Sequence, residues 1–474
     1  MMKTWQIILF VLAMSSSQGL AENQSSTLDL ATYVERYLQV SPILSQSHIV
    51  EEQRRLDKAI VDQSFTSQIN IQPFISQSSI DVTPGSYEDQ TRDSQIQLDL
   101  RQSLATGTQL GVRSAYSWRQ SERESETNPT ESLAFYLEQN LWQNFAGRQR
   151  GMRQQIAESR LQRAILEKES ALLQECVAAS RLYLDLFTHQ QMRQLFEETA
   201  KDAADIYQRY QKLFQQRLIR ETEYLTAESD LLTNKKRLLD EKQRYEQALL
   251  AFLLSIKQEA SETYLQNPTV NLPEETRKLK QEEFLSLRQI RRLDLEIAES
   301  RNQLDLARDQ SRSQIDLVFE AGRGKSQQIV EFGLLTSERQ YVQLGIRADI
   351  PLMNRVPAFE TDRAKAEVLL NEERRRASLL EAQLESERMH SRWQFLQERM
   401  DLTQKRSKVL NAKLKSARQQ VDRMQMELFD YIRHRTELIN SRLEEFENQR
   451  DFWNQRLESW LLMDMTPEFC RIPT

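Results

Sequence analysis

The sequence predicts an α+β fold, mostly α with a smaller share of β, in which one order of elements occurs twice. After the first 21 residues, glycine occurs only within positions 85–151 and 322–345. Residues 152–267 and 358–466 contain neither glycine nor proline and are rich in Glu, Gln, Arg, Leu and Ala. Helix interiors exclude glycine, which loses more backbone entropy, and proline, which lacks an N–H. Inside the glycine windows apolar and polar residues alternate, which predicts strands with one apolar face.

The length and composition favour one body made of two similar halves. The chain has 474 residues, 28% of them charged, and a mean hydropathy of −0.66. Length alone suggests about three domains, but the repeated order of elements overrules this. We place the first structural repeat at 22–267 and the second at 281–466, with a linker at 268–280 and a tail at 467–474. The formal net charge of −6 gives no reason to expect nucleic acid as a partner.

Residues 1–21 have the pattern of a secretory signal peptide. Lys3 supplies a positive start, residues 7–13 are apolar, and the small residues Gly19 and Ala21 place cleavage after Ala21. The alternative is an uncleaved anchor, which is disfavoured because the apolar run is too short to span a bilayer. No cysteine follows Ala21 to carry a lipid anchor, and no later stretch is apolar for long enough to predict a transmembrane helix.

In the first half, a helical segment at 27–63 precedes the strands, and Pro42 predicts a break in it. Strands are expected within residues 66–143 and long helices over 145–258. Turns or loops are predicted at Pro84-Gly85, Thr106-Gly107 and Asn128-Pro129. The apolar members of the alternation are Ile69, Ile71, Ile96, Leu98, Leu100, Leu110, Val112, Tyr116, Trp118, Leu133, Phe135 and Leu137.

The second half follows the same order. A helix is expected at 282–309, strands within 313–351 with a polar loop at 322–333, and long helices over 358–464. Apolar residues spaced by seven predict coiled-coil packing; these are Leu225, Leu232 and Leu239 in the first half, and Ile439, Phe446 and Trp453 in the second. A shift of 214 residues aligns these two heptads and places residues 220–227 on 434–441.

Strands of about ten residues with one apolar face are typical of a membrane β-barrel. A soluble sheet covered on one side gives the same alternation, but the predicted export and the Gln, Asp and Arg of the polar side favour the barrel. Tyr116, Trp118 and Phe135 are candidates for an aromatic girdle. One chain has too few strands to close a pore, so several copies are expected to complete it. The helices then form either a solid coiled-coil rod or a hollow tube, which suits a pore better.

The reactive residue types show no pattern of a catalytic or metal site. The four histidines lack metal-ligand spacing, and neither a Ser-His-Asp arrangement nor a phosphate-binding loop is supported. We therefore expect no enzyme activity and no cofactor. Cys176 lies on the apolar side of a helical run, which favours a buried free thiol, and the sequence gives no basis for pairing it with Cys470.

Several short motifs occur in a fixed order in both halves. Ser41-Pro42 falls in the opening helices, Gln139-Asn140-Leu141 follows the first strand region, and Ile350-Pro351-Leu352 follows the second. Residues 217–227 and 431–441 lie within the two long helical runs. Over nearly the whole mature chain this order resembles the TolC-like outer-membrane efflux proteins, with their Asn-Pro, Gln-Pro-Leu and periplasmic helix-tip motifs.

The resemblance implies a homotrimer that shares a β-barrel in the outer membrane, continued by a long periplasmic α-helical coiled-coil barrel. It implies a passive exit duct of a tripartite efflux or type I secretion system, which carries small molecules or polypeptides across the periplasm and outer membrane. Its partners would be outer-membrane lipids, a periplasmic adaptor (membrane fusion) protein and an inner-membrane transporter. The family's protomer has four strands, whereas six alternating segments are counted here. The hairpin at 95–118 either enlarges the barrel or projects from it.

The resemblance also implies a gate at the periplasmic helix tips. Glu223 takes an acid position of the first tip, and Arg433 and Glu437 take the basic and acid positions of the second. In the family such residues hold the mouth closed. Arg433 and Glu437 are four residues apart and share a helix face, and acids repeated around a narrow mouth favour cations. A solvated surface cluster of charges gives the same pattern.

Three departures from the family affect this gate. The tip glycine is replaced by Arg217 in one half and by Tyr431 in the other, so the turn differs or shifts. Leu428 and Asn440 replace expected polar groups, which leaves a gate with fewer bonds. Alternatively, the aromatic residues Phe429 and Tyr431 act as a plug.

Two other classes of protein fit parts of the pattern. A periplasmic coiled-coil adaptor has one long helical hairpin within a glycine-rich β domain, whereas two hairpins and separate strands are predicted here. A secreted coiled-coil structural protein does not need the alternating strands. The efflux duct accounts for both features.

Overall fold

The computed structural model describes residues 28–63, 67–80, 89–121, 128–258, 280–330, 333–350 and 355–470. The predicted signal peptide, the linker apart from Lys280, the Pro84-Gly85 loop and Pro351-Leu352 lie outside the described residues. The chain divides into two compact units. The sheet unit takes Ile43–Ala171 and Leu279–Leu384, and the tip unit takes the described parts of Met1–Pro42, Leu172–Lys278 and Glu385–Thr474. Each unit combines segments from both halves of the sequence.

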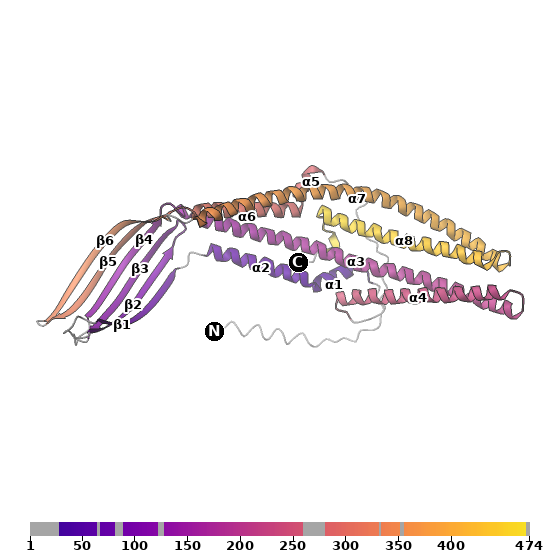
Figure 1. The fold of residues 1–474 in the computed structure, drawn as a ribbon, viewed down its shortest axis with the longest axis horizontal. Coiled ribbons are helices and arrows are strands. Elements are labelled where there is room, and N and C mark those ends of the chain that lie inside the picture. The colour runs from indigo at the N-terminus through magenta and orange to yellow at the C-terminus, as the bar shows by residue number, and fades with distance from the viewer. Residues whose placement is uncertain are drawn as a thin grey trace. The chain divides into compact units, whose positions relative to one another are not determined.

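The sheet unit begins with α2 (Pro42–Asp62), followed by β1 (Gln68–Ile80), β2 (Asp89–Ser103), β3 (Thr108–Ser121), β4 (Asn128–Asn140), the short 3-10 helix η1 (Phe145–Gly147) and the first part of α3 (Arg148–Gln215). Later in the chain come α5 (Gln281–Ser286), α6 (Arg288–Gln310), β5 (Gln314–Val330), β6 (Gly333–Asp349) and the first part of α7 (Val356–Asp422). The strands lie side by side in one sheet (Figure 1).

Within the described residues the sheet has six strands in sequence order, and every neighbouring pair is antiparallel. All the alternating segments are strands, and the hairpin at 95–118 belongs to the sheet as β2 and β3. The expected polar loop at 322–333 is wrong, because residues 322–330 extend β5 and pair with β6 through backbone groups, whatever their side chains. Pro129 does not lie in the predicted loop, because it pairs with Trp118 near the start of β4. The start of a strand tolerates a residue that lacks an N–H.

The register gives the sheet one apolar face and one polar face. Ile71 lies opposite Leu98, and Val112 lies between Leu100 and Phe135. The apolar face is open, since Ile71 is 63% exposed. On the other face, the Tyr136 hydroxyl donates to Asp99 Oδ1 at 2.9 Å and accepts from Arg101 Nε at 3.2 Å. Period-two alternation therefore separates an uncovered apolar surface from a hydrogen-bonded polar one.

Two tyrosines lie across glycines on the polar face. A Cβ on Gly111 would be 2.2 Å from Tyr136 Cζ, and one on Gly322 would be 2.7 Å from the Tyr341 hydroxyl oxygen. Each tyrosine is the cross-strand partner of its glycine. The Tyr341 hydroxyl also donates to Glu320 Oε1 at 2.7 Å. Only glycine leaves room for these rings to lie close to the sheet.

The junction between strands and helices in the sheet unit is tightly built. The β2–β3 turn, predicted at Thr106-Gly107, is confirmed, and Gly107 adopts φ +74°. It packs on Gly147 at φ +72°, where a Cβ would lie 1.8 Å from the Ala105 carbonyl oxygen. Asn140 ends β4 and its amide donates to the fully buried Asp316 at 3.1 Å. This contact explains an asparagine at a position where the resembling family has proline.

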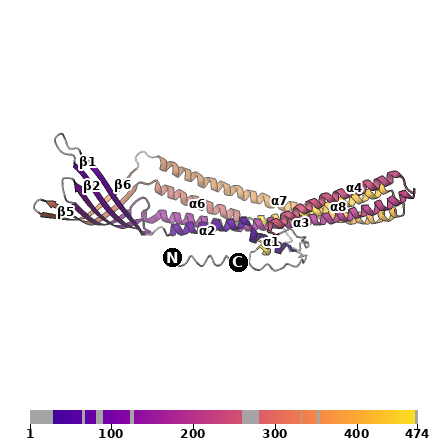
Figure 2. The ribbon, with the colours of Figure 1, turned by 90° about the horizontal axis from the view of Figure 1, so that it is seen from below.

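The tip unit contains α1 (Leu30–Val40), the second parts of α3 and α7, α4 (Glu221–Ser255), α8 (Leu428–Met463) and the 3-10 helix η2 (Glu468–Cys470). Asp29 caps α1 by accepting from the Thr32 N–H at 3.1 Å. The break at Pro42 is confirmed, because α1 ends at Val40 and α2 starts at Pro42, a first-turn position that suits proline. Toward their turns, α3, α4, α7 and α8 lie side by side (Figures 1 and 2).

The expected free thiol at Cys176 is wrong. Cys176 forms a disulfide with Cys470, with their Cα atoms 5.8 Å apart and both residues fully buried. The bond joins α3 to η2 across 294 residues of sequence. Sequence reasoning missed it because the two cysteines are brought together only by tertiary packing.

The two predicted heptads have different environments. Ile439 is buried with Met192 and Phe196, and Phe446 packs against this cluster. Leu225, Leu232 and Leu239 are instead 51%, 60% and 68% exposed. The second heptad therefore packs within the chain, whereas the first presents an open apolar stripe.

Candidate functional site

The turn between α3 and α4 forms the first helix tip. α3 ends at Gln215, and Arg217 adopts the left-handed conformation with φ +60°. The Leu218 N–H then donates to the Leu213 carbonyl at 2.9 Å, which closes the helix as glycine usually does. Glu223 lies in the first turn of α4, where its carboxylate accepts from the Arg220 N–H at 3.3 Å.

The turn between α7 and α8 forms the second tip, and it is not where the sequence alignment placed it. α7 ends at Asp422, Met424 adopts φ +57°, and the Gln425 N–H donates to the Gln420 carbonyl at 2.8 Å. The two turn residues differ by 424 − 217 = 207 positions. The alignment by 214 is therefore one heptad off, and Tyr431 lies inside α8 rather than in the turn.

An apolar cluster joins the helices just behind the two turns. It draws on all four long helices and buries Ile206, Tyr210, Ala227, Ala417, Val421, Leu428 and Tyr431. Tyr431 is only 2% exposed, so its ring is a packing residue of this cluster. Of the two aromatic plug candidates, Phe429 projects from the surface, being 66% exposed.

A network of charges crosses this cluster. The Asp202 carboxylate on α3 accepts from Arg418 Nη1 at 2.6 Å, from Arg435 Nη1 at 2.9 Å and from the Tyr431 hydroxyl at 3.0 Å. Arg435 Nη2 also contacts both carboxylate oxygens of Asp230 on α4. Arg435 is 4% exposed. The network therefore ties α8 to both α3 and α4, and α7 to α3.

The environment of the network favours charged arginines and a neutral tyrosine. Burial alone lowers the pKa of Arg435, but the charges and hydrogen bonds of Asp230 and Asp202 outweigh it and raise that pKa above its ordinary value. Burial, together with the negative charge of Asp202, raises the pKa of Tyr431 to about 12. At neutral pH the arginines and Tyr431 therefore keep the protons that they donate to the carboxylates of Asp202 and Asp230.

The gate residues expected from sequence lie at the edge of this network. Arg433 Nε is 3.6 Å from Glu437 Oε1, so the structure brings these two together. Glu437 also accepts from Lys413 Nζ at 3.2 Å, and this bond, with the positive charges nearby, lowers the Glu437 pKa. Glu223 is held by the Arg220 backbone, and the described residues show no ion pair between Glu223 and Arg433.

The network residues Arg435, Asp202 and Asp230 were missed by sequence reasoning, although a signal for one of them exists. Arg435 continues the stripe Leu428, Tyr431, Ile439 at spacings of three and four, so it is a charge within an apolar helix face. Such a residue is buried only when it is paired. Its partners on other helices, Asp202 and Asp230, show no comparable pattern in the sequence.

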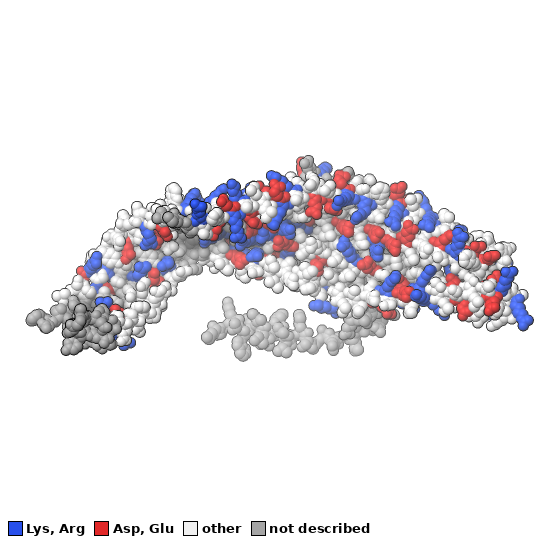
Figure 3. All heavy atoms as spheres, viewed as in Figure 1, with Lys and Arg blue, Asp and Glu red and all other residues white. Residues whose placement is uncertain are grey.

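Three other observations concern the rest of the described chain. In the part of the chain that the structure describes, no cluster of three or more His, Cys, Asp or Glu side chains is placed to hold a metal ion. Over the face seen in Figure 3, acidic and basic side chains intermix along the helices. Each described helix is too short or too polar to cross a membrane.

Solved structures share this architecture. The CmeC outer membrane channel of Campylobacter jejuni matches with a TM-score of 0.68 and 14% identity, over 94% of this chain and 90% of its own. VceC, an outer membrane protein of Vibrio cholerae, gives 0.68 and 14%, over 92% and 95%. This chain has the TolC-like outer-membrane channel fold. The open state of the MtrE outer membrane channel of Neisseria gonorrhoeae matches it with a TM-score of 0.67 and 12% identity, over 95% and 94%. No protein-family model and no curated protein matches the sequence itself.

Proposed function

We propose that this protein is the outer-membrane exit duct of a tripartite efflux or type I secretion system. The observation that carries the proposal is a sheet with an exposed apolar face and a charged, hydrogen-bonded face, joined to paired long helices in the TolC-like channel fold. The duct is passive: it needs no catalytic residue or cofactor, and a transporter supplies the work. The cargo is small molecules or polypeptides.

The dimensions of the sheet suit a bilayer. From Thr108 to Trp118, β3 advances ten residues, which is about 34 Å along the strand and roughly 25 Å across a membrane at the usual strand tilt. The rings of Tyr116 and Trp118 pack at 5.6 Å toward the far end of β3. Trp142 and Phe145, 56% and 51% exposed, lie just beyond the helix-side end of β4. Aromatic residues at both ends of an apolar face are typical of a membrane sheet.

Self-assembly accounts for the surfaces that one chain leaves open. In the described sheet, β1 and β6 each pair on one side only. On the helices, Leu225, Leu232 and Leu239 of α4 are exposed, as are Phe395, Leu402 and Val409 of α7. Both sets are spaced by seven, the spacing of a coiled-coil seam. A homotrimer would pair the strand edges into a barrel and cover these stripes with neighbouring helices.

The tips then form the periplasmic gate, facing an adaptor protein and an inner-membrane transporter. The Arg435–Asp202–Asp230 network holds each protomer's tip helices together, and Arg433, Glu437 and Glu223 flank it. Arg433→Ala and Glu223→Ala are expected to raise single-channel conductance, and Glu437→Ala to lower cation preference. Wild-type conductance and selectivity in all three variants would leave only a solvated surface cluster.

Fractionation tests the proposal directly. The mature chain, cleaved near Ala21, should be recovered from outer membranes only with detergent and should size as a trimer. Recovery as a soluble periplasmic monomer would overturn both the location and the assembly. Bilayer recordings on the purified trimer then test the channel itself.

A further inference from the structure

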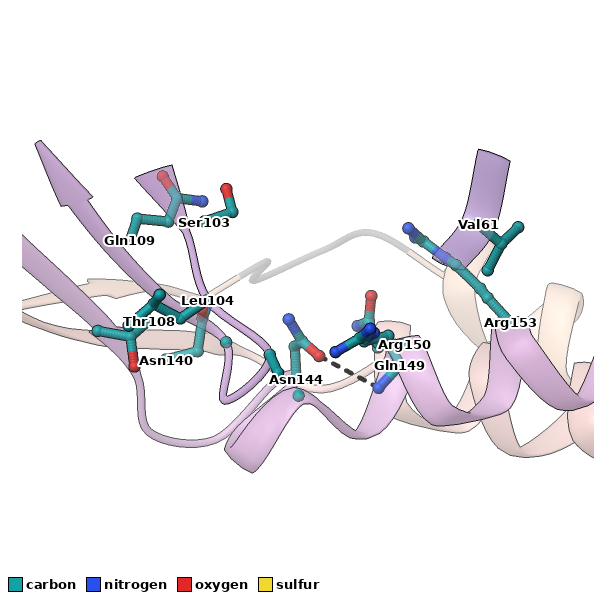
Figure 4. Close-up of a pocket in the computed structure, with 13 residues that line it drawn as sticks. Val61, Ser103, Leu104, Thr108, Gln109, Asn140, Asn144, Gln149, Arg150 and Arg153 are labelled. Atoms are coloured by element: carbon teal, nitrogen blue, oxygen red, sulfur yellow. Dashed lines mark hydrogen bonds between the residues drawn. The ribbon is translucent and has the colours of Figure 1, made fainter. Parts of the chain in front are cut away.

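A polar pocket of about 210 Å³ lies in the sheet unit, where the strand ends meet the start of α3 (Figure 4). Ser103 and Gln109 line it from the β2 and β3 side, and Asn144, Arg150 and Arg153 line it from the α3 side. Its lining contains two arginines, several neutral hydrogen-bonding side chains and no acidic residue. Such a lining suits an anion that accepts several hydrogen bonds.

Two acids beside lining residues of the pocket already have partners. Asp309 is 2% exposed and accepts from the Asn144 N–H at 2.8 Å and from Gln149 Nε2 at 3.0 Å. Asp62 accepts from Gln154 Nε2 at 2.8 Å. Among the described residues, Arg153 makes no hydrogen bond or ion pair. Arg153 therefore adds an unpaired positive charge to the lining of the pocket.

A second cavity, about 540 Å³, adjoins the first and shares Val61 and Arg153 with it. Its other lining residues include the apolar side chains of Ile60, Ile156 and Leu306. Its acid Asp57 is bonded to Arg54 at 3.0 Å, and its Arg160 is bonded to Glu299 at 2.7 Å. A basic polar chamber thus opens beside a mainly apolar one, which is the arrangement that an amphiphile needs.

The position of the pocket in the sheet unit indicates which kind of amphiphile it suits. Ser103 and Asn140 are the last residues of β2 and β4, so the pocket lies where the apolar face of the sheet ends. Leu104 lines it, and Trp142 and Phe145, close in sequence to the lining residues Asn140 and Asn144, are exposed. The Arg312 guanidinium lies 6.0 Å from the Trp142 ring. Exposed aromatic residues and arginines at the edge of a membrane-spanning surface occupy the headgroup layer.

We propose that this pocket binds the phosphate of an anionic glycerophospholipid in the inner leaflet of the outer membrane, with part of an acyl chain in the adjoining cavity. The inference rests on the outer-membrane location proposed above. Arg150 and Arg153 supply the charge, while the Asn, Gln and Ser side chains fix the position of the phosphate oxygens. A bound lipid would fasten the junction of strands and helices at a defined depth in the membrane.

Native mass spectrometry of the purified oligomer with added phosphatidylglycerol tests the site. The wild type should retain this lipid in preference to phosphatidylcholine. Arg150→Gln with Arg153→Gln should weaken retention roughly 30-fold, about fivefold for each positive charge near a headgroup. Arg153→Gln alone, at an exposed position without a partner, should weaken it about fivefold without affecting folding. The matched control, Arg363→Gln with Arg376→Gln, removes two exposed charges of α7 from the same unit and should retain the lipid as the wild type does.

Three outcomes would overturn the site. Equal lipid retention by the wild type and both pocket variants would show that the pocket does not bind the lipid. Loss of the lipid from the control variant to the same extent as from the pocket variants would show the same. Complete displacement of the lipid by inorganic phosphate at equal concentration would reduce the pocket to a simple anion site. These results leave the proposed function standing if the wild type fractionates with the outer membrane. Absence of the wild type from the outer membrane would instead overturn the proposed function, and the lipid site with it.

Discussion

Arg435 of α8 contacts both carboxylate oxygens of Asp230 on α4 through one guanidinium nitrogen. This ion pair is buried, since the arginine side chain is 4% exposed and the aspartate side chain is 8% exposed. Removing one partner of a buried ion pair leaves the other charge buried and unpaired, whereas an apolar pair of similar size is often as stable as the ion pair. Such a pair is therefore weak evidence for stability alone, but it suits the proposed gate, whose closed state must also open. Because Arg435 also reaches Asp202 on α3, one side chain spans three helices.

Arg435→Ala should open or loosen the tips far more than Arg433→Ala. Loss of Arg435 leaves Asp230 and part of Asp202 uncompensated, a cost of about 3 to 5 kcal/mol for a buried pair. Arg433 is a suitable control, because its side chain is 68% exposed and 3.6 Å from Glu437, a pair worth at most about 1 kcal/mol. Single-channel conductance and protease sensitivity of the tips measure the difference. Equal effects of the two substitutions would contradict the view that the Arg435–Asp202–Asp230 network holds the tip helices together.

Tyr431→Phe should change how the tips respond to alkaline pH. An unfolded tyrosine titrates near about 10, and in the fold the pKa of Tyr431 is about 12. Because the folded pKa is the higher one, the stability from the neutral hydroxyl is complete below about pH 10 and is lost as the pH rises toward 12. The wild type should therefore lose more stability than Tyr431→Phe over this range. Denaturant midpoints measured at several pH values check this, and parallel curves would refute it.

Leu232→Asp and Phe446→Asp should separate assembly from folding. Leu232 is 60% exposed in the single chain, so the substitution should lower trimer yield while the protomer still folds. Phe446 packs against Met192, Phe196 and Ile439, so a charge there should destabilise the protomer itself by several kcal/mol. Circular dichroism and native sizing distinguish the two results. Undiminished trimer yield in Leu232→Asp would show that the α4 stripe is not a subunit seam.

Reduction of the Cys176–Cys470 disulfide should destabilise the tip unit. Removing a disulfide typically costs about 2 to 4 kcal/mol, and this one closes a loop of 294 residues in sequence. The Cys176→Ser and Cys470→Ser double variant should melt at a lower temperature than the oxidised wild type, and it should not respond to reductant. Thiol titration of the denatured, unreduced wild type should detect no free thiol. Two titratable thiols would contradict the bond.

The elements of the fold were largely predictable, because each rests on local pattern. Alternation identified the strands, Pro42 the helix break and the seven-residue spacing the Ile439 seam. The position of the second helix tip was not, and the reason is the same spacing. A heptad pattern matches itself after a shift of seven, so an alignment by 214 superposes apolar stripes just as the offset of 207 set by the turns at Arg217 and Met424 does. The alignment by 214 therefore placed Tyr431 at the turn, whereas the structure places it inside α8.

Contacts between residues far apart in the sequence were the other feature that could not be predicted. The contacts of Arg435 with Asp202 and Asp230, and of Cys176 with Cys470, join residues 205 to 294 positions apart. No local periodicity relates such residues, since their proximity follows from how whole helices pack. The exposed Leu225 stripe shows the same limit, because its spacing predicts a seam but does not say which chain completes it.

In the proposed duct, the number of strands contributed by each chain would set the bore of the assembly. Three sheets like the described six-stranded one would close an eighteen-stranded cylinder. At about 4.8 Å between strands and a tilt of about 40°, its backbone diameter would be roughly 36 Å, against about 24 Å for twelve strands. Diffusion through so wide a mouth would scarcely discriminate between solutes by size. Any discrimination between solutes by size would then depend on the proposed gate at the helix tips, with its few arginine–aspartate contacts.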